Sequence, residues 1–338
     1  MSHPPVRIGL VGAGGIAQVS HLPAYARMGD ARVVAVCDAD MGKARRVAER
    51  FNIPRVTASF EELVAWDDVD AVDICLPNHL HAPAGVAALE SGKHVLVEKP
   101  FTRSHKEAAV LVAAAEKAGR ILMAGFNNRY RDDVRLLRKF VARGELGSVY
   151  FAKAGWLMRA ATWTGEGWRR SRKEAGGGAL LDLGIQVLDV ALWLMGMPEV
   201  VSVSATAHPR PRGDSVESTA VGLIRLEGDA SLALEVSWGL LMEKDVAYLN
   251  LFGDEGAALL HPLRLRKRVD GTLRDATPET EPSREAYRHS YETEIRHFVD
   301  CVRNETTPDS PGSEAAYVLS VLEALYRSAE EGREVPAR

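Results

Sequence analysis

The sequence predicts a two-domain α/β protein, with a doubly wound parallel sheet first and then an α+β domain built on an open, mainly antiparallel sheet. At 338 residues the chain is longer than one ordinary domain. Short apolar runs alternate with helical segments from Val6 to about Gly125, which is typical of a parallel sheet covered on both faces. From Ser148 onward apolar residues recur with a period of two, which indicates antiparallel strands. We place the boundary between residues 1–125 and 126–338.

The N-terminal part contains five apolar runs rich in valine and isoleucine, and each fits a buried parallel strand. These runs are Val6–Val11, Arg32–Cys37, Val72–Leu76, His94–Val97 and Ile121–Ala124. Two capping boxes mark helix starts, Ser59 with Glu62 and Ser104 with Glu107, in which the serine hydroxyl takes a free amide and the glutamate reaches back to the cap. Gly119 is suited to end the helix that follows the second box.

The C-terminal part contains five strand candidates and a closing helix. The strands are Ser148–Met158, Val201–Ala207, Ser218–Leu226, Ser231–Trp238 and Val246–Phe252, and the helix runs from Ser313 to about Glu331 and stops at Gly332. A tight connection at Glu227–Asp229 fits a hairpin. The stretch Asp270–Ala286 resembles a long solvated loop.

Apolar residues on both faces of this predicted sheet indicate that both faces are covered. Tyr150, Trp156, Leu249 and Leu251 fall on the second face in our interpretation. We expect helices on one face and a second subunit on the other, giving a homodimer or homotetramer. The alternative is that the chain's own loops fold over the sheet.

Composition limits the compartment and the partners. The 42 basic and 46 acidic residues give a net charge of −4, which supplies no electrostatic footprint for a nucleic acid. Three cysteines without metal-ligand spacing predict neither a disulfide framework nor a metal site. The sequence shows no signal-peptide core, and no apolar stretch approaches the length needed to span a bilayer. We expect a cytoplasmic protein without nucleic-acid or membrane partners.

The first strand ends in a G-x-G-x-x-A fingerprint formed by Gly12, Gly14 and Ala17. Gly12 allows the tight turn, Gly14 lets the backbone approach a pyrophosphate, and Ala17 keeps the following helix close to the strand. Asp38 ends the second strand, where an acidic residue binds a ribose diol and repels a 2′-phosphate. The fingerprint predicts a Rossmann domain that binds NAD. NADP remains the alternative because Lys43, Arg45 and Arg46 lie close in sequence.

Polar residues follow two further strands, at the carboxyl edge of the sheet where ligands bind. Leu76–His81 ends the strand that begins at Val72, and Glu98, Lys99 and Pro100 end the strand that begins at His94. A lysine after a buried strand can have its pKa lowered and transfer protons. The alternatives are that Lys99 is a surface lysine paired with Glu98, and that His79 and His81 are helix-entry residues bonded to the backbone.

A third polar cluster lies on an otherwise apolar helix after a triple glycine. Helical spacing places Asp182, Gln186 and Asp189 on one stripe, where polar groups need partners or line a cavity. Structural hydrogen bonding is a fair interpretation for Asp189, and less so for Asp182 near the helix start.

Taken as an ordered set, these motifs resemble the glucose–fructose oxidoreductase and inositol dehydrogenase family. The set comprises GAGGIA, LPNHLH, EKP, GFNNR, Trp168 with Arg169, GGGALLDLG and YRSAEEGR, and the match runs essentially from Arg7 to Val335. The resemblance implies a nucleotide-binding domain, a C-terminal α/β domain that supports oligomers, and hydride transfer between a nicotinamide and a carbon bearing hydroxyl or carbonyl. The substrate it implies is a sugar, an inositol or a related polyol.

The resemblance also assigns residues to roles. Gly12, Gly14, Gly15, Ile16 and Ala17 would face the diphosphate, and Asp38 the adenosine ribose. The other cofactor-side positions would be Leu76, Pro77, Asn78, His81, Glu98, Lys99, Asn127, Trp168, Arg169 and Tyr291. Lys99 matches the lysine that contacts the reacting oxygen, and positions 182 and 186 match the acid–histidine pair of the family.

Gln186 departs from the family pattern, because a carboxamide cannot exchange a proton as histidine does. Three explanations remain: Lys99 carries the proton while Asp182 and Gln186 orient the substrate; another titratable group, such as Asp182 or a tyrosine, has taken over; or the protein binds ligands without turnover. We favour the first.

The sequence therefore predicts an NAD(P)-dependent dehydrogenase or reductase acting on CH–OH groups. The competing hypotheses are a ligand-sensing regulator and a glycoside-cleaving enzyme that uses NAD transiently. Four residues hint at a polar or anionic substrate pocket: Arg129, Arg159, Trp163 and Arg169.

Overall fold

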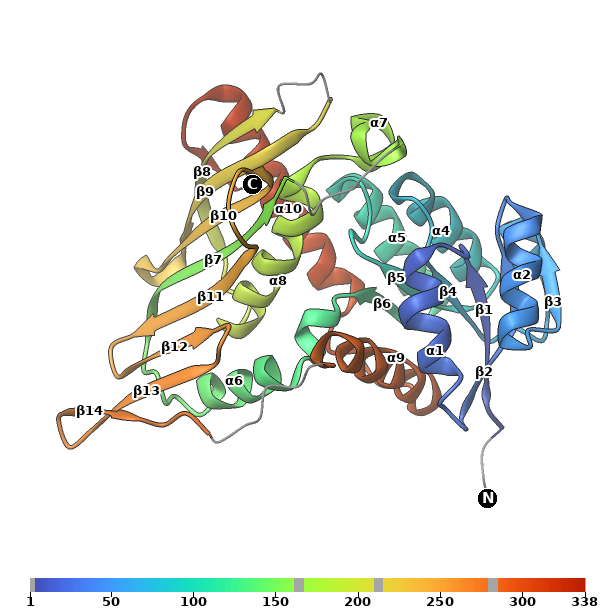
Figure 1. Cartoon of the computed structure of the whole chain (residues 1–338), viewed down its shortest axis with the longest axis horizontal. Coiled ribbons are helices and arrows are strands. Elements are labelled where there is room, and N and C mark those ends of the chain that lie inside the picture. The colour runs from blue at the N-terminus through green and yellow to red at the C-terminus, as the bar shows by residue number, and fades with distance from the viewer. Residues whose placement is uncertain (1–3, 161–166, 210–214, 279–284, 338) are drawn as a thin grey trace. The chain divides into compact units, whose positions relative to one another are not determined.

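Two separate sheets organise the chain (Figure 1). The computed structural model describes residues 4–160, 167–209, 215–278 and 285–337. The chain divides into a first unit of Met1–Tyr130 with Glu285–Ala316 and a second unit of Arg131–Arg284 with Tyr317–Arg338. The return of residues 285–316 to the first unit was not anticipated from the sequence.

The first unit is a six-stranded sheet in the order β3-β2-β1-β4-β5-β6, with every neighbouring pair parallel. Its strands are β1 Val6–Val11, β2 Ala31–Cys37, β3 Arg55–Thr57, β4 Ala71–Ile74, β5 His94–Glu98 and β6 Leu122–Gly125. This confirms the predicted doubly wound sheet, and β3 is the one strand of it that we did not expect. The strand order reverses between β1 and β4, and ligands of such folds bind at that point, beyond the carboxyl ends of the strands.

Helices cover this sheet. They are α1 Leu22–Tyr25, which continues a π-helical segment Ala17–His21, and α2 Met41–Phe51, α3 Phe60–Val64, α4 His81–Glu90, α5 His105–Ala118 and α9 Ala286–Asn304. Helix α9 packs Ile295, Phe298 and Val299 against Ile8 and Leu96 of the sheet, all of them fully buried. A helix from the C-terminal part of the chain therefore completes the core of the first unit.

The two capping boxes are half confirmed. Ser59 and Ser104 accept hydrogen bonds from the amides of Glu62 and Glu107, at 3.2 Å each. The glutamates do not reach back to the caps as expected. Glu62 accepts from the Thr57 hydroxyl instead, and Glu107 bonds the amide and guanidinium of Arg103. Each carboxylate therefore bonds a neighbouring side chain or amide in place of the cap, Thr57 for Glu62 and Arg103 for Glu107.

The second unit is a nine-stranded sheet in the order β14-β13-β12-β11-β7-β10-β9-β8-β15. Its strands are β7 Val149–Arg159, β8 Val200–Pro209, β9 Glu217–Leu226, β10 Ser231–Leu240, β11 Val246–Gly253, β12 Gly256–Leu260, β13 Arg264–Val269, β14 Thr272–Asp275 and β15 Val335–Pro336. Among the described strands of this second sheet, only β7 and β10 pair in parallel, which confirms a mainly antiparallel sheet. Four helices belong to this part of the chain: α6 Asp132–Ala142, α7 Arg172–Ala175, α8 Ile185–Leu194 and α10 Gly312–Glu331.

The expected solvated loop at Asp270–Ala286 is wrong in its first part. Strands β13 and β14 form a hairpin there, turning at Asp270 and Gly271, which both have positive φ. The hairpin is rich in charge and mostly exposed, so its sequence lacks the apolar alternation that reveals a strand. Residues 279–284 lie outside the described part of the chain.

The assignment of Leu249 and Leu251 to the outer face of the sheet is also wrong. They pair with Ala154 and Ala152 of β7 and are buried within this chain, on the face opposite to Phe151 and Phe252. Val201 is 54 % exposed because a register shift between Val200 and Ser202 turns it outward.

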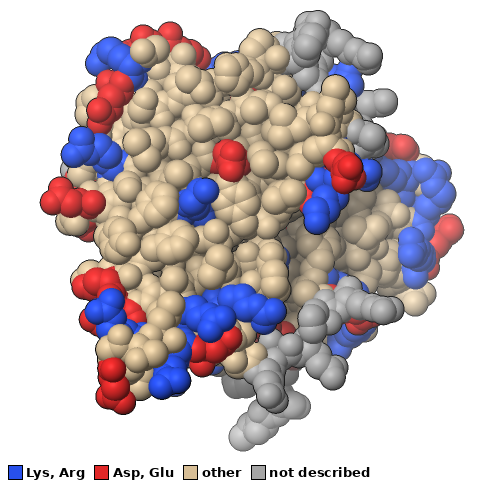
Figure 2. All heavy atoms as spheres, turned by 60° about the vertical axis from the view of Figure 1, so that its left-hand side comes forward, with Lys and Arg blue, Asp and Glu red and all other residues tan. Residues whose placement is uncertain are grey.

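The opposite face of the second sheet is open within this chain. Phe151 and Phe252 stack there with ring centroids 5.7 Å apart, and Val221 and Leu223 are each 48 % exposed. Figure 2 shows this side as a broad surface on which charged groups are sparse.

One helical stretch, Arg172–Leu194, is long and apolar enough to cross a membrane, which corrects our statement that no such stretch exists. Of its most apolar window, 89 % is buried inside the protein. The stretch is therefore a core helix of the second unit, and its length and composition reflect burial against protein.

Candidate functional site

The turn after β1 is shaped for close approach of a ligand to the backbone. Gly12 has a φ of +100°, and a Cβ there would lie 2.5 Å from the backbone oxygen of Cys75, so no other residue fits. At Gly14 the nearest atom to a Cβ would be 4.0 Å away, and at Gly15 nothing lies within 4 Å. The fold itself therefore leaves open space next to these two glycines.

Asp38, at the end of β2, is tied to the same turn. Its Oδ2 accepts from the Ala13 amide at 2.9 Å and lies 2.7 Å from the Lys43 ammonium, while Oδ1 accepts from the Asp40 amide at 2.9 Å. The carboxylate is thus fixed next to the glycine turn, as the NAD fingerprint requires. Lys43, on the first turn of α2, is the cation nearest to it.

His81 joins the two loops that follow β4 and β5. Its Nε2 lies 2.7 Å from the Leu76 carbonyl oxygen and its Nδ1 lies 2.9 Å from the Pro100 carbonyl oxygen. Burial lowers the pKa of His81 despite the two carbonyl oxygens, which favour the charged form. The ring sits in the position of a backbone-bonded helix-entry residue, one of the two alternatives open from the sequence. Asn78, in the same loop, is also buried.

Glu98 ends β5 at the carboxyl edge of the sheet, and the half-buried Lys99 follows it directly. Glu98 Oε2 accepts from the Lys99 amide at 2.8 Å, and Glu98 Oε1 lies 3.0 Å from Nε2 of His21. The other ring nitrogen of His21 lies 2.7 Å from Oδ2 of Asp73, on β4. His21 and Asp73 were not singled out from the sequence.

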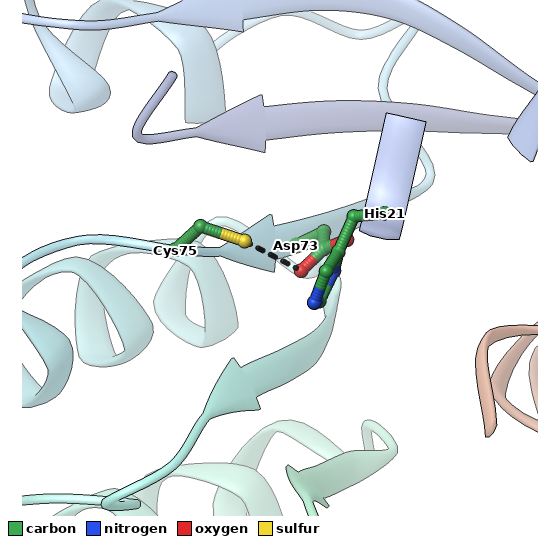
Figure 3. A group of neighbouring side chains, drawn as sticks. All are labelled: His21, Asp73 and Cys75. Carbon is green, nitrogen blue, oxygen red and sulfur yellow. Dashed lines mark hydrogen bonds and ion pairs between the residues drawn. The ribbon is translucent and has the colours of Figure 1, made fainter. Parts of the chain in front are cut away.

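His21, Asp73 and Cys75 converge in the core of the first unit (Figure 3). Their ligand-type atoms lie within 4.8 Å of one another, and the Cys75 thiol donates to Asp73 at 3.7 Å. Burial and the neighbouring Asp73 raise the pKa of Cys75 to about 12, so the sulfur is a neutral thiol. The sequence could have pointed to Asp73, because a carboxylate inside the apolar run of β4 must have a buried partner.

Helix α9 carries Tyr291 and bonds Asn127, two residues that we expected on the cofactor side. Tyr291 is buried with its ring centroid 5.6 Å from that of His21, and Asn127 Nδ2 donates to the hydroxyl of Ser290 at 2.9 Å. Tyr291 and Asn127 are thereby brought to the same part of the unit as Glu98, although they lie far apart in the sequence.

In the second unit, a buried glutamate holds the triple glycine. Glu217 accepts from the amides of Gly178 at 3.0 Å and Leu180 at 2.9 Å, and from the Tyr326 hydroxyl at 2.8 Å. A Cβ on Gly178 would lie 1.9 Å from the Glu217 backbone oxygen, and one on Gly177 would lie 2.1 Å from the Tyr326 hydroxyl. The glycines are therefore required for packing against Glu217 and Tyr326, and Glu217 fixes the start of the helix that carries Asp182.

Asp182 lies in a π-helical segment, Leu180–Gly184, that continues into α8, and Gln186 lies one turn further on. Gln186 is buried, and its Nε2 donates to the backbone oxygen of Asp182 at 3.2 Å. Asp189, on the same stripe, is buried as well. Trp168 and Arg169 lie in a short 3₁₀ turn, Gly167–Arg170, with the Arg169 guanidinium 4.5 Å from the Trp168 ring centroid.

The expected polar pocket residues do not form one set. Arg129 is fully buried and bonds Glu314 and the Asp309 carbonyl oxygen, so it has a structural role that corrects its assignment to a substrate pocket. Arg159 lies 3.6 Å from Asp245 and is partly exposed. Trp163 lies outside the described residues.

Comparison with known proteins identifies the family. A model of the oxidoreductase family, NAD-binding Rossmann fold, matches residues 6–126, and its C-terminal alpha/beta domain matches residues 138–337. The chain belongs to this oxidoreductase family. The predicted relationship to glucose–fructose oxidoreductase and inositol dehydrogenase is confirmed, and the chain is an NAD(P)-dependent oxidoreductase acting on CH–OH groups.

Relatives match the chain along almost its whole length. D-glucoside 3-dehydrogenase of Escherichia coli is 29 % identical, covering 99 % of this chain and 98 % of the relative. D-xylose 1-dehydrogenase (NADP(+)) 2 of Haloferax volcanii is 29 % identical over 97 % of this chain and 98 % of its own. The solved structure of GenD2 from gentamicin A biosynthesis, in complex with NAD, is 28 % identical with a TM-score of 0.87, covering 99 % of this chain and 97 % of that one.

Proposed function

We propose that this oxidoreductase acts on a ring hydroxyl of a sugar or a related polyol, with Lys99 as the group that takes the hydroxyl proton. The single observation that carries the proposal is the position of Lys99, directly after β5 at the carboxyl edge of the NAD-binding sheet. The names of the relatives, a D-glucoside and a D-xylose dehydrogenase, support a sugar as the substrate class.

The residues of the first unit fit a nicotinamide dinucleotide. Gly14 and Gly15 leave open space above the turn after β1, the helix start there favours a diphosphate, and Asp38 is fixed beside the turn for a ribose diol. Further cofactor-side residues of this unit in the proposal are Ile16, Ala17, Leu76, Pro77, Asn78, His81, Asn127 and Tyr291. Bound NAD supplies the hydride acceptor, or NADH the donor.

Lys99 withdraws the proton from the substrate hydroxyl in the oxidation direction and returns it in the reduction direction. An amine performs this step when its pKa is brought towards neutrality by its surroundings. Asp182 accepts a hydrogen bond from the substrate hydroxyls, and Gln186 donates or accepts one without changing charge. Holding the hydroxyl in one orientation accounts for a large part of the rate.

A screen of sugars tests this proposal. The purified chain is incubated with NAD or NADP and with methyl α-D-glucopyranoside, D-xylose, D-glucose or myo-inositol, and the absorbance of the reduced nicotinamide is followed. We expect reduction with at least one sugar, faster with NAD than with NADP. Cofactor binding without turnover of any substrate in either direction would support a sensing regulator, which Gln186 favours, and would contradict the proposal. Cleavage of an aryl glucoside without net NADH would support transient oxidation.

We also propose that two copies of the chain associate through the open face of the second sheet. The stacked Phe151 and Phe252 and the exposed Val221 and Leu223 form an apolar surface with few charges, of the kind that marks a protein–protein contact. Light scattering after gel filtration should give a dimer or tetramer. The double substitution Val221→Glu with Leu223→Glu should give a monomer, and a monomeric wild type would contradict this proposal.

The cytoplasm is the proposed compartment. Cys37, Cys75 and Cys301 are buried free thiols, as in proteins of a reducing compartment. Fractionation of the native cells should place the chain with soluble cytoplasmic enzymes, and recovery with periplasmic or membrane markers would contradict this.

A further inference from the structure

A buried chain of charged groups runs through the first unit to the backbone of Lys99. Asp73 on β4, His21 before α1 and Glu98 on β5 are all buried, with His21 between the two carboxylates at 2.7 and 3.0 Å. The second oxygen of Glu98 accepts from the Lys99 amide at 2.8 Å. The three residues come from segments far apart in the sequence, so this alignment exists only in the folded unit.

The geometry favours a charged histidine. Both ring nitrogens of His21 face carboxylate oxygens, and an imidazole donates to both only as the imidazolium. Burial opposes that charge and the facing Asp73 carboxylate supports it, and the net result is a pKa of His21 well above its ordinary value. Loss of the positive charge would leave two carboxylates buried in apolar surroundings, which is costly.

Other titratable groups surround the cluster. Tyr25 from α1 and the thiol of Cys75 face Asp73, and burial raises the pKa of each, so both are neutral. Tyr291 and Glu294 approach from α9; the pKa of Tyr291 is raised by burial and by Glu98. The His21 imidazolium therefore lies between the carboxylates of Asp73 and Glu98.

We propose that His21 is a positioning residue for Lys99. The imidazolium holds one carboxylate oxygen of Glu98 in place. The other oxygen then stays bonded to the Lys99 amide and fixes the position of the Lys99 backbone at the edge of the sheet. The proposal rests on the proposed function, in which Lys99 takes the hydroxyl proton. No metal is needed in this account, because a proton on His21 holds the carboxylates together.

Two substitutions of similar size separate the two bonds of His21. In His21→Asn the amide takes the place of Nδ1, near Asp73, and is too short to reach Glu98. In His21→Gln the amide nitrogen takes the place of Nε2 and keeps the donor to Glu98. Both variants lose the charge and each keeps one of the two contacts, so a difference between them reports which contact matters and not the charge.

Amide exchange of Lys99 measured by NMR tests the anchor without a substrate. We expect the Lys99 amide to exchange about tenfold faster or more in His21→Asn, because losing the anchoring bond makes local opening easier. A tenfold change corresponds to about 1.4 kcal/mol in the free energy of opening. Exchange in His21→Gln should stay close to wild type. Equal exchange in the two variants would overturn the proposal. In wild type, nitrogen-15 NMR should show both ring nitrogens of His21 protonated at pH 8, and a neutral ring, or a stoichiometric metal bound to it, would also overturn it.

Turnover distinguishes this proposal from the function on which it rests. With NAD and the sugar that is turned over fastest among the four of the screen, His21→Asn should lose about tenfold or more in kcat with little change in the KM of NAD, and His21→Gln should restore most of it. Should Lys99→Met remain active, the proposed function fails. Should Lys99→Met be inactive while His21→Asn keeps full kcat, the positioning role alone fails.

Discussion

The Asp38 carboxylate lies 2.7 Å from the Lys43 ammonium, beside the glycine turn of the cofactor site. Because the same carboxylate oxygen also bonds the Ala13 amide, Asp38 is held in place whether or not a cofactor is bound. An acidic residue at this position favours the ribose diol of NAD, whereas a cation beside it favours the 2′-phosphate of NADP. Asp38 and Lys43 together therefore bear on the choice of cofactor.

Asp38→Ser should therefore reverse the cofactor preference. Losing a charged hydrogen-bond acceptor for the ribose should weaken NAD use by about 10- to 100-fold in kcat/KM, and Lys43, freed from its partner, should improve NADP use. The matched control is Lys43→Gln, which should lower NADP use and leave NAD use unchanged. An unchanged NAD to NADP ratio in Asp38→Ser would contradict the assignment of Asp38 to the ribose.

The two glycines of the turn should respond differently to alanine. Gly12→Ala places a Cβ against the Cys75 oxygen at a positive φ, and should lower the unfolding free energy by about 1–3 kcal/mol. Gly14→Ala meets only an atom 4.0 Å away, so its stability should equal that of wild type while its affinity for NADH falls. Urea unfolding and NADH fluorescence measure the two effects. Wild-type NADH affinity in Gly14→Ala would argue against the diphosphate at this turn.

Removal of the Glu217 carboxylate should destabilise the second unit. Glu217→Ala leaves the buried amides of Gly178 and Leu180 without an acceptor, and should cost about 2–4 kcal/mol of unfolding free energy. It should also lower kcat, because the helix start that carries Asp182 loosens. Tyr326→Phe, the control, removes one donor and should cost about 1 kcal/mol. Equal effects of the two substitutions would mean that the amides are not held by Glu217.

Stability should fall with pH above neutrality because of His21. The pKa of His21 is raised in the folded state, so its contribution is fully present below the unfolded value of about 6.5 and is lost as pH rises through the folded value. The expected slope in that window is about −1.4 kcal/mol per pH unit. Urea unfolding at pH 6, 7, 8 and 9 measures it, with the exposed His289→Asn as control. A wild-type stability that is flat or rises across this range would contradict the prediction.

The sequence predicted those parts of the fold that rest on short-range patterns. Buried strands such as β1 appear as continuous apolar runs, and helix ends such as Gly119 carry residues that a backbone conformation demands. The glycine turn was predictable for the same reason, since the positive φ of Gly12 is a local requirement. Strand β3 is only three residues long and the β13–β14 hairpin is mostly charged and exposed, so neither has an apolar period to detect.

Relationships between distant residues were not predictable from one sequence. The partners of His21 are Asp73 and Glu98, 52 and 77 residues away, and nothing near His21 indicates a role. Likewise Glu217 gave no local sign that it caps the glycines 39 residues earlier. The assignment of Arg129 to a substrate pocket was wrong because one sequence does not distinguish a buried arginine paired with Glu314 from an arginine that binds a ligand.

The most direct test of the central claim compares Lys99→Met with wild type in two measurements on the same preparations: kcat for the sugar identified by the screen, and the dissociation constant of NADH. We expect kcat to fall by about 100-fold or more, since proton transfer by a placed group contributes about that much, while NADH affinity stays within about threefold. A Lys99→Met enzyme that turns over at the wild-type rate would contradict the claim that Lys99 carries the proton.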